Sequence, residues 1–88
     1  MTAITGNRSI FVVDSGWVFL CENWERDGHS YHLKDSNVIR VWGTTAGLGQ
    51  IALKGPTKET ILDYCGNPSV PENKVLVVIP CTYTPKSK

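Results

Sequence analysis

Short apolar runs separated by turn residues dominate the first half of the chain. Ile10 to Val13 and Trp17 to Cys21 flank an Asp-Ser-Gly cluster, a pattern typical of two antiparallel strands joined by a tight turn. In the second run, residues 17, 19 and 21 alternate with residues 18, 20 and 22, and both sets are largely apolar. The sequence therefore predicts a hairpin with one face in the core. Its other face is expected either to meet a partner subunit or to be wrapped by the rest of the domain.

Four more strands are predicted further along the chain. The second strand is expected to continue from Glu22 to Trp24 and to turn at Asp27-Gly28, because glycine tolerates positive φ. Residues 30–33 then alternate in polarity, and the run 75–79 is apolar at every position, as in a strand buried on both faces. The four predicted strands are Ser30–Leu33, Val38–Trp42, Thr60–Leu62 and Val75–Ile79.

One short helix is predicted between the strands at 38–42 and 60–62. Leu48, Ile51 and Ala52 lie at i, i+3 and i+4, which places them on one helical face. Thr44 or Thr45 is expected to cap its start, and Gly55-Pro56 to end it. The sum is a mainly β fold, a small six-stranded meander closing into a barrel or tight sandwich with one short helix. Residues 1–88 are expected to form a single domain, with an ordered core over about 9–82 and a flexible C-terminal tail.

The charge, the apolar stretches and the cysteines of the chain argue against several classes of protein. Nine Lys and Arg residues against eight Asp and Glu residues give a net charge of +1, which argues against non-specific nucleic-acid binding. No apolar stretch is long enough for a signal peptide or a spanning helix, so we expect a soluble intracellular protein without membrane contact. The three cysteines, Cys21, Cys65 and Cys81, are an odd number without tight spacing. They are expected to be small buried thiols instead of a disulfide framework.

The segment from Arg40 to Lys58 carries the most unusual chemistry. Glycines allow a backbone to approach a ligand, a helix start favours an anion, and a tryptophan offers a stacking face beside cations. The alternative interpretation is a tight strand-to-helix connection whose glycines serve turn geometry only, since neither a Walker nor a complete dinucleotide motif is present. The expected ligand-binding residues are Arg40, Trp42, Thr44, Thr45, Gly47 and Lys54.

Other chemistry has weak support in the sequence. His29 and His32 are three residues apart, so on a strand their rings point to opposite faces, and no Cys or carboxylate stands at a metal-ligand spacing. The cysteines and His32 carry no local signature of a nucleophilic site. We therefore expect no catalytic residue, no metal site, no cofactor and no enzyme activity.

The segment VIRVWGTTAGLGQIALKGP at 38–56, with TKETILDYCG and VLVVIPC after it, resembles a family of small uncharacterised phage and prophage proteins, a domain of unknown function. The resemblance implies a viral origin and transfers no catalytic residue. Small β proteins of phages often antagonise host defence. The resulting hypothesis is a non-enzymatic binding protein in the cytoplasm of the host bacterium, expected to be a homo-oligomer. It would sequester a nucleotide-type signal or block a host defence protein. The alternative is a structural or assembly module of a phage particle, with the first hairpin as its contact.

Overall fold

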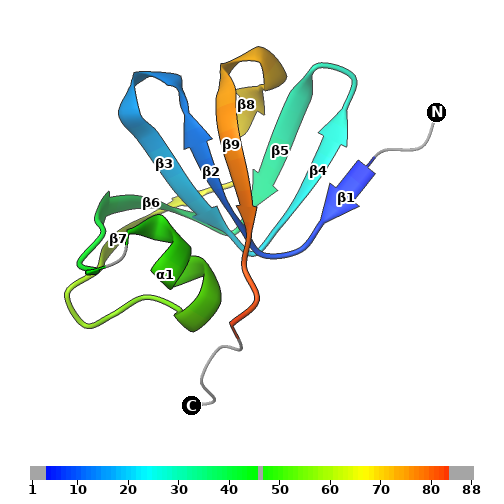
Figure 1. Ribbon diagram of the computed structural model, residues 1–88. Coiled ribbons are helices and arrows are strands. Elements are labelled where there is room, and N and C mark those ends of the chain that lie inside the picture. Colours follow the sequence, from blue (N-terminus) through cyan, green and yellow to red (C-terminus); the bar gives the residue numbers. More distant parts are fainter. Residues whose placement is uncertain (1–3, 46, 84–88) are drawn as a thin grey trace.

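The first two apolar runs pair as the predicted hairpin in the computed structural model, which describes residues 4–45 and 47–83 (Figure 1). Strand β2 (Ser9–Val13) runs antiparallel to β3 (Trp17–Cys21). A single 3-10 turn, η1 (Asp14–Gly16), joins them, and Gly16 has a φ of 85° that glycine adopts without strain. The Asp-Ser-Gly signal is thus confirmed as a turn.

The described residues contain nine strands, one α-helix and two 3-10 turns. The remaining elements are β1 (Ile4–Gly6), β4 (Asn23–Asp27), β5 (Ser30–Lys34), β6 (Ser36–Val41), α1 (Leu48–Lys54), β7 (Ile61–Gly66), β8 (Ser69–Pro71), η2 (Glu72–Lys74) and β9 (Val75–Pro80). The expected number of six strands is wrong. Residues 4–6 and 69–71 form short strands that the apolar pattern does not reveal, and β7 is longer than the predicted 60–62.

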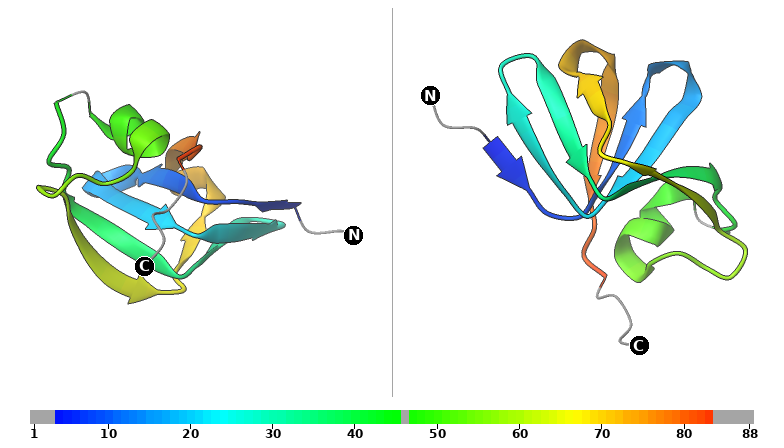
Figure 2. Two further views of the ribbon diagram at one scale, coloured as in Figure 1. Left: turned by 90° about the horizontal axis from the view of Figure 1, so that it is seen from below. Right: turned by 180° about the vertical axis from the view of Figure 1, so that it is seen from behind.

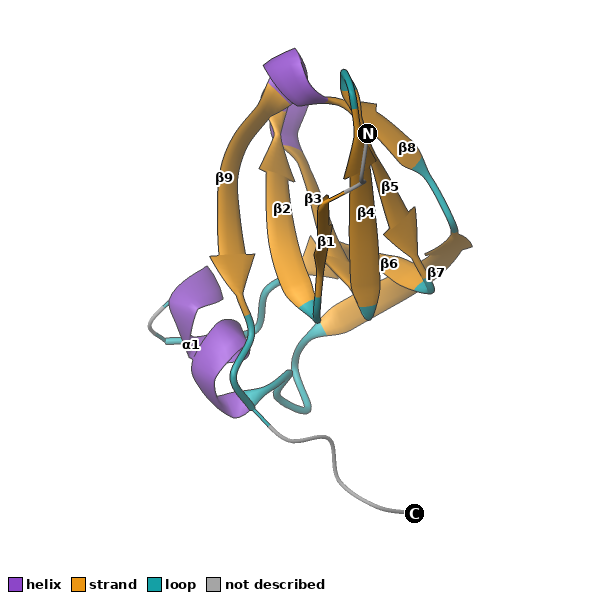
Figure 3. Ribbon diagram, turned by 90° about the vertical axis from the view of Figure 1, so that its right-hand side faces the viewer, coloured by secondary structure: helices purple, strands orange, loops and turns teal. Residues whose placement is uncertain are grey.

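The strands form two antiparallel sheets. The four-stranded sheet has the order β1-β4-β5-β8, and the five-stranded sheet has the order β7-β6-β3-β2-β9. In Figure 3 the strands β9, β2 and β3 stand on one side and β4, β5 and β8 on the other. The mainly β prediction is confirmed. The expectation that the run 75–79 is buried on both faces is wrong, since Leu76 and Val77 of β9 are 65% and 48% exposed.

The third additional strand, β4, arises because the chain passes from one sheet to the other partway along the predicted second strand. Cys21 pairs with Ser9 in the five-stranded sheet, whereas Asn23 pairs with Lys34 in the four-stranded sheet, and only Glu22 separates them. Strands β5 and β6 are likewise separated by one residue, Asp35, whose φ is 48°. The expectation that Glu22 to Trp24 simply continues the second strand is therefore wrong in one respect: the chain continues, but it bends into the other sheet.

A first hydrophobic cluster, here the inter-sheet cluster, joins the two sheets. Phe11 and Phe19 contribute from the five-stranded sheet, while Leu33 and Val70 contribute from the four-stranded sheet. Phe11 and Leu33 are fully buried. Three aromatic rings meet there in edge-to-face contact, with centroid distances of 5.0 Å for Phe11–Tyr31, 5.7 Å for Phe11–Trp24 and 5.3 Å for Trp24–Tyr31.

The second cluster, here the α1 cluster, lies on the other face of the five-stranded sheet. Ile10 and Leu20, the neighbours of Phe11 and Phe19, pack there against Ile51 of α1. Figure 2 shows α1 lying against this sheet. The four-stranded sheet thus packs on one face of the first hairpin and the helix on the other, while Trp17 next to the turn stays 53% exposed.

Helix α1 has the predicted buried face of Leu48, Ile51 and Ala52, and it ends at Gly55 as expected. The Gly55 N–H donates to the Ile51 carbonyl at 2.8 Å. The predicted threonine cap is wrong: the N-cap is Gly47, which has a φ of 78° and makes no side-chain cap bond.

The segment after β9 contacts the C-terminal end of α1 and holds it in place. The Thr82 N–H donates to the Ala52 carbonyl at 2.8 Å, and the Tyr83 ring packs over Gly55. Arg8 donates to the Glu22 carboxylate at 2.6 Å and lies 5.0 Å from the Tyr83 ring centre. We call residues 81–83 the C-terminal strap. Among the described residues, no helix has the length and apolar character to cross a membrane.

Candidate functional site

The predicted binding segment leaves the sheet at the end of β6 and returns at the start of β7. Hydrogen bonds join the residues that follow β6 to those that precede β7. The Thr57 hydroxyl donates to the Gly43 carbonyl at 2.6 Å, and the Thr60 hydroxyl donates to the Trp42 carbonyl at 2.7 Å. A Cβ on Gly43 would lie 2.3 Å from the backbone of Glu59, so only glycine fits. The alternative interpretation, glycines that serve chain geometry, holds at this position.

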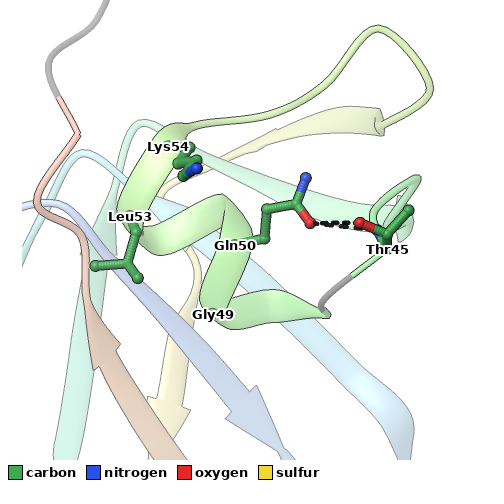
Figure 4. Close-up of a pocket in the computed structure, with 5 residues that line it drawn as sticks. All are labelled: Thr45, Gly49, Gln50, Leu53 and Lys54. Atoms are coloured by element: carbon green, nitrogen blue, oxygen red, sulfur yellow. Dashed lines mark hydrogen bonds between the residues drawn. The ribbon is translucent and has the colours of Figure 1, made fainter.

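The two threonines of the segment use their polar groups within the loop. The Thr44 hydroxyl donates to the Gly47 carbonyl at 3.0 Å. The Thr45 N–H and hydroxyl both point to Gln50 Oε1, at 3.2 and 3.3 Å (Figure 4). These groups hold the entry to α1, and binding a phosphate through them would require breaking those bonds first.

A shallow cavity of about 560 Å³ lies over α1. Its lining comes from Thr45, Gly49, Gln50, Leu53 and Lys54 (Figure 4). The size falls within the range of small-ligand sites, about 300–1,000 Å³. Leu53 is 63% exposed, because it stands off the helical face that packs on the sheet. Two of the predicted residues, Thr45 and Lys54, therefore share a cavity.

Trp42 borders the same loop. Its indole is 44% exposed, and a Cβ on Gly47 would meet its ring at 3.9 Å. We call the cavity lining together with Trp42 the α1 rim. The side chain of Trp42 is neither sealed in the core nor fully exposed.

Arg40 lies apart from the α1 rim. Its guanidinium pairs with Asp63 at 2.7 Å, and Asp63 is in register with Val38, which packs against the inter-sheet cluster. Ile39, by contrast, belongs to the cluster under α1. Arg40 and Asp63 therefore project from the face of β6 and β7 opposite the helix. The structure brings Trp42, Thr44, Thr45, Gly47 and Lys54 together and leaves Arg40 out.

Gly49, Gln50 and Leu53 are site residues that the sequence analysis missed. None of the three carries a charge, so composition gave no signal for them. The positions of Gln50 and Leu53 off the Leu48–Ile51–Ala52 face do predict that these two side chains point away from the sheet. That helical phase is the information that could have identified them.

A second polar arrangement lies on the four-stranded sheet. His32 faces Ser69 directly across β5 and β8, with Nδ1 2.8 Å from the Ser69 hydroxyl and Nε2 2.9 Å from the Asp27 carboxylate. The three residue types are those of a hydrolytic triad, but Ser69 and Asp27 are exposed on a sheet surface. Nucleophilic catalysis also needs donors for the developing oxyanion and a site that excludes water. Among the described residues, no group of three His, Cys, Asp or Glu could hold a metal ion.

The cysteines are poor nucleophiles. Burial raises the pKa of Cys21 to about 12 and that of Cys81 to about 11, and it also raises the pKa of Cys65. The thiolate is the reactive form, so Cys21 and Cys81 carry very little of it near neutral pH. The expectation of buried thiols is confirmed for Cys21, whereas Cys81 is half-buried and Cys65 is exposed on the edge strand β7.

Comparison of the chain with protein-family models, with curated proteins and with solved structures finds no match. The α1 rim is therefore interpreted from its geometry and chemistry.

Proposed function

We propose that this chain is a non-enzymatic, phage-encoded binding protein that antagonises host defence by engaging a host protein at the α1 rim. The observation that carries the proposal is that Leu53, 63% exposed, lines a cavity over α1, while Trp42, 44% exposed, lies on the loop that leads into the helix. Tryptophan is enriched among the residues that dominate binding energy at protein interfaces, and such anchors work best beside a pocket. The phage origin rests on the sequence resemblance.

Engagement of a protein is favoured over capture of a nucleotide because three of the expected phosphate-binding residues already have partners. Arg40 pairs with Asp63, and the Thr44 and Thr45 hydroxyls bond within the loop. A phosphate held without several donors gains little over its hydration. An apolar anchor needs no such donors, and burying it releases water from both partners.

Infection of a defence-bearing host tests this proposal. Bacteria carrying defined defence systems would express the wild-type chain, the Trp42→Ala variant or the Trp17→Ala variant, and phage plating would be compared. Trp17 is a matched control, since it is 53% exposed but lies on the first hairpin. We expect plating to rise at least about 100-fold with wild type and with Trp17→Ala, and to fall back with Trp42→Ala. Equal protection by all three would reject the α1 rim as the contact.

Sequestration of a nucleotide-type signal is the second candidate, favoured by the cavity size and by Lys54 on its lining. In that version Trp42 stacks on a base and Lys54 neutralises a phosphate. Isothermal titration with cyclic dinucleotides and ADP-ribose derivatives tests it. Heat that disappears in Lys54→Glu would support this version, and the absence of heat with all of them would leave the protein-blocking version alone.

The assembly alternative has less support. It relies on an outward face of the first hairpin, and Ile10 and Leu20 on that face pack under α1.

Finally, we propose that the two sheets form the small barrel or tight sandwich that the sequence predicts. Support comes from the near-continuous passage of β3 into β4 and of β5 into β6, and from the shared inter-sheet cluster.

A further inference from the structure

Within the described part of the chain, the two sheets leave four edge strands, β1 and β8 in one and β7 and β9 in the other. An edge strand presents unpaired backbone N–H and C=O groups, which invite another strand to pair unless the edge is protected. Short length, proline, charge and bulges are the usual protections. The four edges of this protein differ sharply in how many of these they carry.

Three edges are protected. Strands β1 and β8 are only three residues long, and β8 ends in Pro71. Strand β7 carries Asp63 in its ion pair with Arg40, and its register against β6 shifts at two places. A foreign strand gains few hydrogen bonds along any of them.

Strand β9 is the exception. Its six residues are Val-Leu-Val-Val-Ile-Pro, without a charge, and Leu76 and Val77 are 65% and 48% exposed. Its one register irregularity against β2 lies at the η2 end, next to Val75. Figure 3 shows β9 on the outer side of β2.

The ladder on β2 fixes which groups of β9 face outward. The Cys81 N–H donates to the Arg8 carbonyl at 2.9 Å, and Ser9 is paired with Pro80. Antiparallel ladders alternate, so Ile79 and Val77 turn toward β2 while Val78 and Pro80 turn their backbone groups to the open side. Pro80 loses no bond to β2 at this outward position, but it can offer only its carbonyl, and no N–H, to a strand that pairs on the open side.

We infer that β9 is a homodimer interface, where it pairs antiparallel with β9 of a second copy to join the two five-stranded sheets. A register centred on Val78 sets Val77 opposite Ile79 of the second copy and Leu76 opposite Pro80 of the second copy. An uncharged apolar strand is complementary to itself, because no like charges meet and every cross-strand pair is apolar. Lys74, the residue that precedes β9, lies 3.9 Å from Asp14 of its own chain, which balances its charge at the end of the interface.

Sedimentation velocity across a concentration series tests the inference on the full chain. Wild type is expected to dimerise. Val77→Lys is expected to raise the dimer dissociation constant at least about 100-fold, because it sets two ammonium groups near each other across the two-fold axis. Ile61→Lys is the matched control: it places the same charge at a 39%-exposed position on β7, the opposite edge of the same sheet, and is expected to dimerise like wild type. Thermal melting of each variant checks that it is folded.

A second measurement does not depend on a charged variant. Val77→Cys, made with Cys65→Ser to remove the exposed native thiol, should form a covalent dimer with a short bis-maleimide, whereas Ile61→Cys in the same background should not. A wild-type chain that stays monomeric up to about 500 µM would overturn the inference, as would a dimer lost in Ile61→Lys but kept in Val77→Lys. Either result leaves the α1 rim proposal standing, since Trp42 lies on another part of the chain.

Discussion

The inter-sheet cluster and the α1 cluster cover opposite faces of the same five-stranded sheet, yet they are held in different ways. Strands of both sheets build the inter-sheet cluster, and three aromatic rings interlock in it. The α1 cluster is aliphatic and is closed by one seven-residue helix that the C-terminal strap holds in place. A helix this short is not stable on its own. The fold therefore depends on the first cluster, while the candidate site depends on the second.

Truncation of the central aromatic should have the largest effect. Phe11→Ala leaves a hole at a fully buried position that contacts both Trp24 and Tyr31. The expected loss is about 3–5 kcal/mol in the free energy of unfolding, a large share of the total for a domain of this size. Urea unfolding followed by tryptophan fluorescence measures it. A loss below about 1 kcal/mol would mean that this cluster does not dominate the fold.

The corresponding change under the helix should cost less and act locally. Ile51→Ala truncates the fully buried centre of α1, with an expected loss of about 2–4 kcal/mol. Hydrogen exchange should show faster opening of residues 48–54, with the amides of β4 and β5 still protected. Uniform loss of protection throughout both sheets would contradict the separation of the two clusters.

Two glycines of the α1 region offer a paired test of backbone strain. Gly55 has φ 88° and ψ 171°, a region essentially restricted to glycine, and a Cβ there would lie 3.1 Å from the Tyr83 ring. Gly55→Ala is expected to cost about 1–3 kcal/mol. Gly49 is helical with open space around it, so Gly49→Ala should instead stabilise by about 0.5–1 kcal/mol. Thermal melting of the two variants separates them, and a shift of the same sign in both would refute the argument.

Alkaline pH should lower the stability gradually, through a cysteine of the inter-sheet cluster. Burial raises the pKa of Cys21 to about 12, whereas the unfolded thiol keeps its ordinary value near 9. Between these values the unfolded chain releases a proton that the folded chain retains, so stability falls as pH rises above about 9. Urea unfolding from pH 8 to 10.5 should show this decline, with a shallower slope in Cys21→Ala. Identical slopes would remove Cys21 from the account.

Some of the structure could be predicted from local pattern. The hairpin of β2 and β3 follows from two apolar runs around a turn, and the buried face of α1 follows from the spacing of Leu48, Ile51 and Ala52. The end of the helix at Gly55 also follows, because glycine alone accepts the backbone angles required. These features depend on residues close in sequence, and for that reason the chain itself specifies them.

Contacts between distant residues decided the rest. The bend at Glu22 is invisible in the pattern, since the run from Trp17 to Trp24 stays compatible with one strand while its pairing partner changes from β2 to β5. The separation of Arg40 from Lys54 depends on Asp63, 23 residues further on, which pairs with Arg40 on the face away from the helix. Sequence spacing gives the chemistry that a segment carries, but only the packed sheets determine on which face each side chain stands. For this reason the residue types were sufficient to predict that the α1 region is a candidate site. Which of its residues share the cavity followed only from the tertiary structure.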